Sequence, residues 1–274
     1  MKKDYIWSAF KGLCIGSSMM VPGVSGGSMA MILGIYDRMI AAVSGLFKKP
    51  KQNILFLLVV VGGALLGMVA FSRPLSALME RFPYPVGYFF LGCVAGSIPM
   101  IFKRAEIRKF SIQIPLWILL GLVCVLALGL LPANILSEQS GIVQILLQVG
   151  VGILVAIGLV LPGISVMQML ALMGLYSILL EGFSTLNFGL LAGFIPLVIG
   201  CVGGIFLLTG LMDYAMKHYP LPSYLVILGF VLGSLKELYV ELVPGVPAGW
   251  DILFSALAAL LGFFLVLRLS KYDT

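Results

Sequence analysis

The sequence predicts an all-α polytopic membrane protein built from two inverted-topology repeats, each with a re-entrant helical hairpin broken at Pro-Gly and three transmembrane helices. Three observations carry this prediction. Hydrophobic residues make up 61% of the 274 residues and charged residues only 10%, whereas soluble domains carry roughly 25% charged residues. A helix-breaking motif occurs twice inside apolar sequence. Lysine and arginine gather in the loops of one predicted side, as in cytoplasmic loops of membrane proteins.

The helix-breaking motif is the clearest sign of duplication. Val21-Pro-Gly-Val-Ser-Gly-Gly-Ser28 returns as Leu161-Pro-Gly-Ile-Ser165, and Gly34-Ile-Tyr36 returns as Gly174-Leu-Tyr176. Proline removes a backbone donor and glycine adopts turn dihedrals, so the pair ends a helix. Inside a membrane, irregular backbone is tolerated only where protein buries it or where it lines a cavity. Interrupted helices at corresponding positions of two halves therefore predict a transporter's binding site.

Further matched blocks follow the motif in the same order in both halves. Phe82-Pro-Tyr-Pro85 resembles Tyr219-Pro-Leu-Pro222, and Gly96-Ser97 resembles Gly233-Ser234. Each half contains five apolar segments, and an odd number predicts that the second copy is upside down relative to the first. The pairs Gly63 and Gly67, and Gly200 and Gly204, also correspond, with a spacing that allows close helix packing.

About 20 apolar residues are needed to cross the hydrocarbon core as a helix, and this length sets the predicted boundaries. The first repeat is residues 1–136, with a hairpin at 5–47 and helices at 54–71, 86–102 and 112–131; the second is 137–274, with a hairpin at 142–181 and helices at 188–212, 224–243 and 252–269. Charge does not distinguish re-entrant hairpins from spanning pairs. We prefer the hairpins because a spanning pair would place Val-Pro-Gly-Val-Ser at a water interface without polar residues.

The distribution of positive charge predicts that both termini are cytoplasmic. Lys2 and Lys3, the cluster Lys48, Lys49 and Lys51, and the basic residues around Lys103 fall on one predicted side, while only Arg73 and Arg81 fall in predicted outer loops. A basic chain could indicate a nucleic-acid partner, but this bias explains the formal net charge of +6 without one.

The residues after the first Pro-Gly form a candidate anion site. Ser25, Gly26, Gly27 and Ser28 open a helix, and the first N–H groups of a helix lack intrahelical partners and attract anions. Ser165 and Gln168 are the candidates at the second tip. The alternative is that these serines simply cap their helices.

Charged residues inside apolar segments add further candidates, because intramembrane charges are functional by default. Arg38 and Lys236 are candidate partners of a phosphate, and Asp37, Glu181 and Glu237 are candidate carriers of a coupling ion, H⁺ or Na⁺. The sequence does not choose among these carboxylates. The alternative is that Arg38 and Glu181 lie near helix ends and extend to the interface.

No metal, cofactor or enzyme activity is expected. The four cysteines lie in apolar stretches without a CxxC spacing, the only histidine is His218, and no nucleophile–base pair stands out. The sequence does not indicate an oligomeric state.

The paired motifs Val21–Ser28 with Gly34-Ile-Tyr-Asp-Arg38, and Leu161–Ser165 with Gly174-Leu-Tyr176, resemble the PopT-type polyprenyl-phosphate transporter family over essentially the whole chain. This resemblance implies a translocase in the bacterial cytoplasmic membrane that recycles undecaprenyl phosphate, the lipid carrier of cell-wall glycan synthesis, from the outer to the inner leaflet. The second motif departs from the first, with Val166-Met167-Gln168 in place of Gly26-Gly27-Ser28. The alternatives are a secondary transporter of a small anion, which would need a water-lined path, and a channel or scaffold.

Overall fold

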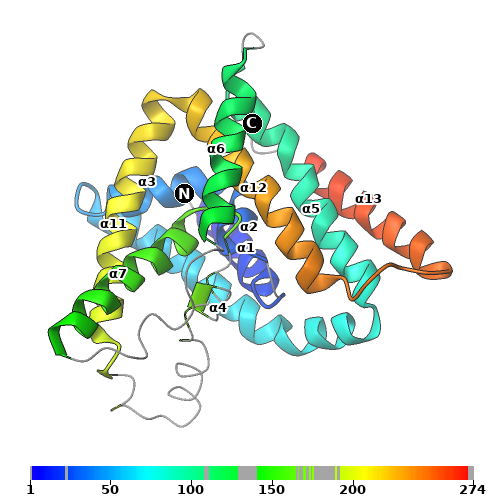
Figure 1. Ribbon diagram of the computed structural model, residues 1–274, viewed down its shortest axis with the longest axis horizontal. Coiled ribbons are helices and arrows are strands. Elements are labelled where there is room, and N and C mark those ends of the chain that lie inside the picture. The colour runs from blue at the N-terminus through cyan, green and yellow to red at the C-terminus, as the bar shows by residue number, and fades with distance from the viewer. Residues whose placement is uncertain are drawn as a thin grey trace.

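The computed structural model describes residues 2–21, 24–107, 111–128, 141–164 and 192–270, together with positions 166, 169–170, 173, 175 and 189. The described residues form ten α-helices and no strand (Figure 1). The helices are α1 (Lys2–Ser18), α2 (Gly26–Ile32), α3 (Tyr36–Ser44), α4 (Pro50–Arg81), α5 (Pro83–Arg104), α6 (Gln113–Leu128), α7 (Gly141–Val160), α11 (Ile195–His218), α12 (Pro220–Leu242) and α13 (Trp250–Ser270).

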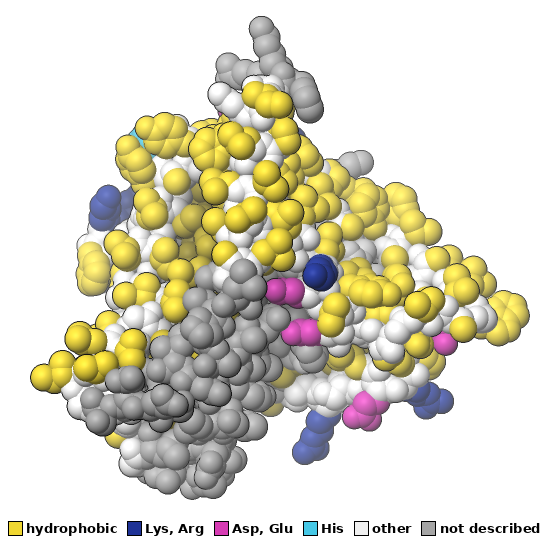
Figure 2. Space-filling model, viewed as in Figure 1, with side chains coloured by type: hydrophobic (Ala, Val, Ile, Leu, Met, Phe, Trp, Pro, Cys, Tyr) yellow, Lys and Arg dark blue, Asp and Glu magenta, His cyan; other side chains and the backbone are white. Residues whose placement is uncertain are grey.

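The helices confirm a multi-pass, all-helical membrane protein over the described residues. Five of them, α4, α5, α7, α11 and α13, are long and apolar enough to cross a bilayer, and the apolar α6 is shorter. Among the described side chains on the face in Figure 2, apolar ones predominate and charged ones are few. In a soluble protein this much exposed apolar surface would be a liability, but in a bilayer it contacts lipid.

Most helix bounds differ from the predicted ones by a few residues, and two differences change the arrangement of the chain. The arm of the predicted 5–47 hairpin that follows the first Pro-Gly is not one helix. Gly34, with φ of +66°, separates α2 from α3, because glycine adopts this left-handed conformation without steric cost. Arg73 and Arg81 do not lie in a loop but belong to α4, which runs for 32 residues. Only Phe82 separates α4 from α5, whose first residue is Pro83, a position where proline is favoured because its missing N–H would be unpaired anyway.

Glycines bring α1 against α4 and, in the same way, α7 against α11. A Cβ on Gly63 would lie 2.3 Å from the carbonyl oxygen of Ala9, and one on Gly200 would lie 2.1 Å from that of Val149. Small residues allow this approach of two backbones, which is the usual basis of helix packing in membranes. Gly63 and Gly200 are matched positions of the two halves, so one packing arrangement occurs twice.

The last helix of each half packs against a helix of the other half. A Cβ on Gly92 of α5 would lie 2.1 Å from the carbonyl oxygen of Ala259 of α13, and one on Gly229 of α12 would lie 2.2 Å from that of Ile118 of α6. The helices α5, α12 and α13 lie together on the right of Figure 1, and α7 and α11 lie on the left. The halves are therefore interlocked rather than separate.

Neighbouring glycines of α4 give a test of this packing. We expect Gly63→Ala to lower the free energy of unfolding in detergent by about 1–3 kcal/mol, the usual cost of overpacking, because its Cβ meets the backbone of α1. Gly62→Ala is the control, since a Cβ there meets nothing within 4 Å. Thermal unfolding of the purified variants measures both, and equal stabilities would contradict the close α1–α4 contact.

Candidate functional site

The two helix breaks meet inside the molecule. After α1 ends at Ser18, the chain turns and α2 begins at Gly26. A Cβ on Gly27 would lie 3.1 Å from the Cα atom of Pro162, so the first tip packs directly on the second Pro-Gly motif. Pro22 and Gly23 lie outside the described residues.

Ser25 caps α2 as the alternative interpretation of its sequence position predicts. Its buried side chain accepts a hydrogen bond of 3.4 Å from the N–H of Ser28. The hydroxyl of Ser25 keeps its own proton for another acceptor. Ser28 is also buried, and its Oγ has no hydrogen-bond partner among the described residues. Capping and ligand binding are therefore compatible at this tip.

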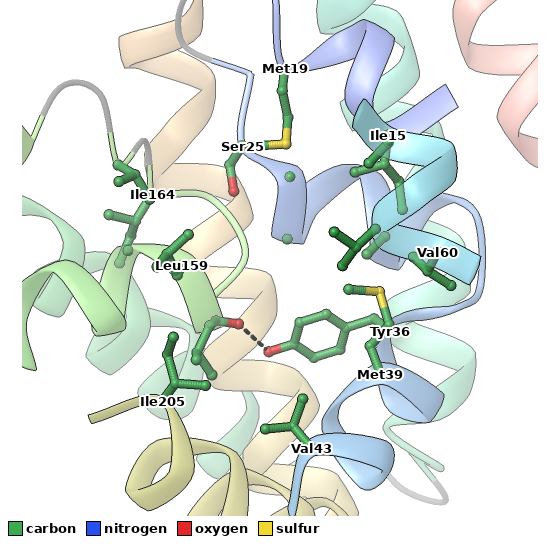
Figure 3. Close-up of a pocket in the computed structure, with 18 of the residues that line it drawn as sticks. Ile15, Met19, Ser25, Tyr36, Met39, Val43, Val60, Leu159, Ile164 and Ile205 are labelled. Carbon is green, nitrogen blue, oxygen red and sulfur yellow. Dashed lines mark hydrogen bonds between the residues drawn. The ribbon is translucent and has the colours of Figure 1, made fainter. Parts of the chain in front are cut away.

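A cavity of about 720 Å³ lies beside the meeting point (Figure 3). Ser25, Gly26 and Gly27 form one edge of it. The rest of the wall comes from α1 to α4, α7, α11 and residues of the two breaks such as Val24 and Ile164, and it is almost entirely apolar. The hydroxyl of Thr209, one of the few polar groups on this wall, donates to the carbonyl oxygen of Ile205 at 2.6 Å. The polar groups free to meet a ligand are therefore concentrated at the first tip.

Tyr36 connects the two halves at the cavity wall. This buried tyrosine, the last residue of Gly34-Ile-Tyr36, donates a hydrogen bond of 2.8 Å to the carbonyl oxygen of Val160, shown as the dashed line in Figure 3. The last carbonyls of a helix have no intrahelical partner, and Val160 ends α7 immediately before the second break. Tyr36 thus satisfies backbone that the break leaves unpaired.

Asp37 joins α3 to two other helices. Its Oδ2 accepts hydrogen bonds from Arg104, at the end of α5, and from the hydroxyl of Tyr224 on α12, the latter at 2.9 Å. Its Oδ1 is buried and has no partner among the described residues. The sequence alone does not identify Arg104 and Tyr224. Arg104 is one of the basic residues around Lys103 that only indicate the cytoplasmic side, and a single tyrosine after Pro-Leu-Pro carries no signal of its own.

Arg38 faces away from the cavity. Its guanidinium donates two hydrogen bonds to Asp4, at 2.9 and 3.0 Å, and lies 4.1 Å from the centroid of the Phe56 ring. The pKa of Asp4 is lowered chiefly by this hydrogen bond. Arg38 remains 44% exposed and does not line the cavity. Its predicted contact with a phosphate stays a prediction.

The other predicted residues are not brought to the cavity. Lys236 is exposed and Glu237 half-buried on α12, and neither lines the cavity. Ser165, Gln168 and Glu181 lie outside the described residues. Within the part of the chain that the structure describes, no three His, Cys, Asp or Glu residues group to hold a metal ion.

Two broken helices meeting beside a cavity, in a chain of apolar helices, are features of a membrane transporter. Residues 15–243 match the family described as undecaprenyl phosphate translocase-like, and the chain belongs to this family. It is 28% identical over 283 residues to a polyprenyl-phosphate transporter of Staphylococcus aureus, covering 98% of each chain. It is 27% identical over 252 residues to a polyprenyl-phosphate transporter of Vibrio cholerae, covering 86% of this chain and 78% of that one. No solved structure matches the chain.

The Asp37–Arg104 pair gives a test of the site's geometry. We expect Arg104→Gln to lower the free energy of unfolding by about 1–2 kcal/mol, because a partly buried carboxylate loses its charged donor. Lys217→Gln is the matched control: it removes an exposed pair with Asp213 on α11, and such pairs contribute about 0–1 kcal/mol. Thermal unfolding in detergent compares the two, and a larger loss for Lys217→Gln would contradict the structural role of Arg104.

Proposed function

We propose that the protein translocates undecaprenyl phosphate across the bacterial cytoplasmic membrane, from the outer to the inner leaflet, without chemical change to the lipid. Family membership and two relatives named polyprenyl-phosphate transporter support this proposal. The observation that carries it is the cavity at the meeting of the two tips. It has one small polar edge and otherwise apolar walls, which suits an amphipathic lipid phosphate.

The phosphate is placed at the polar edge formed by Ser25, Gly26 and Gly27. The N–H groups at the start of α2 have no intrahelical acceptor, and the Ser25 hydroxyl has a proton to donate. Small residues allow a phosphate to approach the backbone here. We assign Ser165 and Gln168 to the same headgroup region from the sequence alone. Arg38 can bind the phosphate only if the phosphate displaces Asp4 from its guanidinium. Lys236 does not line the cavity, so it can contact the phosphate only at another stage of transport.

A small soluble anion is the alternative substrate. To bind in the cavity, the anion would have to exchange its hydration shell for protein groups. An anion that is left unpaired in an apolar environment costs several kcal/mol or more. The described cavity wall contains no charged side chain. An apolar wall is favourable for a prenyl chain and unfavourable for a hydrated anion, which supports the lipid.

The two halves are proposed to be inverted repeats with both termini in the cytoplasm. In α5 and α12, which are matched helices, the start of one lies beside the end of the other: a Cβ on Gly87 would lie 3.2 Å from the Cβ atom of Leu242. Matched helices that run in opposite directions support inversion. The positive-inside bias supports the placement of the termini.

The breaks are proposed to be re-entrant hairpins entering from opposite faces. A Cβ on Gly67, near the middle of α4, would lie 3.0 Å from the backbone nitrogen of Ser17, at the end of α1. The first helix therefore stops about halfway along its long neighbour. This depth supports a hairpin that returns to the side it entered from.

Asp37 is the carboxylate we assign to ion coupling. It has a buried, unpartnered Oδ1 among the described residues, and it links the cavity-lining helix α3 to α5 and α12. Binding of H⁺ or Na⁺ at Asp37 would weaken its pair with Arg104 and allow α3 to move. Glu237 shows no such link to the cavity wall, and Glu181 is proposed on sequence grounds only.

Direct binding tests the proposed substrate. We expect purified protein to bind undecaprenyl phosphate more tightly than undecaprenol or inorganic phosphate, and we expect Gly27→Val to weaken this binding at least about tenfold because its side chain would force the two tips apart. Gly62→Val is the control on an open face of α4. The dissociation constants of the purified variants in detergent provide the readout. Equal affinity for undecaprenol and undecaprenyl phosphate would contradict a phosphate site.

Ion coupling is tested separately. We expect Asp37→Asn to bind undecaprenyl phosphate but to lose the stimulation of lipid transport by an imposed H⁺ or Na⁺ gradient in proteoliposomes, because the amide cannot take up the coupling ion. Glu237→Asn, the comparison variant, should keep the stimulation. If Asp37→Asn responds to both gradients like the wild type, Asp37 is not the coupling group.

A further inference from the structure

The wall of the cavity shows where an apolar chain could lie. Beyond the polar edge at the first tip, its lining is formed mainly by aliphatic, methionine and alanine side chains of α1 to α4, α7, α11 and the two breaks, and the hydroxyls of Tyr36 and Thr209 are already bonded to backbone carbonyl oxygens. Met19 and Met39 are among them, and methionine adapts its shape to irregular apolar ligands. Small residues such as Ala30 and Ala64 leave room between the larger side chains. This surface fits a branched hydrocarbon.

The cavity also has a mouth on the lipid-facing surface. Val61 and Leu65 of α4 and Leu159 of α7 line the cavity, yet they are 51%, 57% and 41% exposed. Leu65 lies halfway along the 32-residue α4. The opening is thus at the depth where a spanning helix meets hydrocarbon rather than headgroups, so an apolar chain can pass through it without crossing water.

The volume limits how much chain is held. A cavity of about 720 Å³ is in the range of sites for small ligands, roughly 300–1,000 Å³, and is too small for a whole polyprenyl chain. The segment next to the phosphate fits inside, and the remainder leaves through the mouth. The polar edge and the mouth lie on one continuous surface, so headgroup and chain are held together.

We propose that this cavity is a binding site for the first isoprene units of a polyprenyl phosphate, which enter sideways from the bilayer through the mouth formed by Val61, Leu65 and Leu159. The inference rests on the proposed function, and it adds that the protein recognises the branched isoprenoid as well as the phosphate. Recognition of the isoprenoid chain then allows the protein to discriminate this lipid from phospholipids, whose phosphate headgroup is accompanied by straight acyl chains.

Adjacent leucines of α4 provide the test. Leu65 lines the mouth, whereas Leu66 is 67% exposed and does not line the cavity. We expect Leu65→Trp to weaken binding of undecaprenyl phosphate and of the short probe farnesyl phosphate about tenfold, because the indole occupies apolar volume that the chain would fill. Leu66→Trp should bind both like the wild type. Val61→Trp, with Val69→Trp as its control, repeats the comparison one turn away.

Competition against undecaprenyl phosphate identifies the chemistry. Farnesyl phosphate should displace it at least about tenfold better than dodecyl phosphate, its straight-chain counterpart, and inorganic phosphate should fail. Equal displacement by farnesyl and dodecyl phosphate would overturn isoprenoid recognition, and equal effects of Leu65→Trp and Leu66→Trp would overturn the mouth. Either result leaves the proposed function standing if undecaprenyl phosphate still binds. A wild-type protein that binds no prenyl phosphate overturns both.

Discussion

The structure depends on satisfying backbone at two helix breaks buried in an apolar chain. Lipid offers no hydrogen bonds, so each freed N–H and C=O must find a partner within the protein. Ser25 accepts from the N–H of Ser28, and Tyr36 donates to the carbonyl oxygen of Val160. Gly27 lets the second break at Pro162 approach the first. Each break is stabilised partly by the other half, so the two halves fold around one shared centre.

The short helix α3 transmits this constraint to the rest of the bundle. Successive residues of a helix point about 100° apart, and three successive residues of α3 contact five different helices between them. Tyr36 reaches α7 through the cavity wall, Asp37 reaches α5 and α12, and Arg38 reaches α1 and α4. Asp37, the proposed coupling residue, is thus the chain neighbour of Tyr36 on the cavity wall, and the same short helix carries both.

The cavity accounts for how a charged lipid could be handled without an aqueous pore. A phosphate needs a few donors at one position, and a prenyl chain needs apolar contact and access to the bilayer. In the proposed site, the first tip supplies the donors, and the wall and mouth supply the contact and the access. Close glycine contacts between the long helices give the bundle a tightly packed frame around the two breaks.

The sequence by itself determined the membrane class, the helical fold and the family, because hydropathy and the Pro-Gly motifs can be recognised without knowing any contact between distant residues. The duplication of the two halves stays a prediction from the repeated motifs. The sequence also placed Ser25, Gly26 and Gly27 at a candidate site, and the structure puts them on the cavity. Only the tertiary structure decided that Gly34 splits the second arm of the hairpin, that Arg38 pairs with Asp4, and that Arg104 and Tyr224 hold Asp37. These partners are far apart in the chain, and a pairing across that separation is fixed by how helices pack, which leaves no periodic or local trace in the sequence.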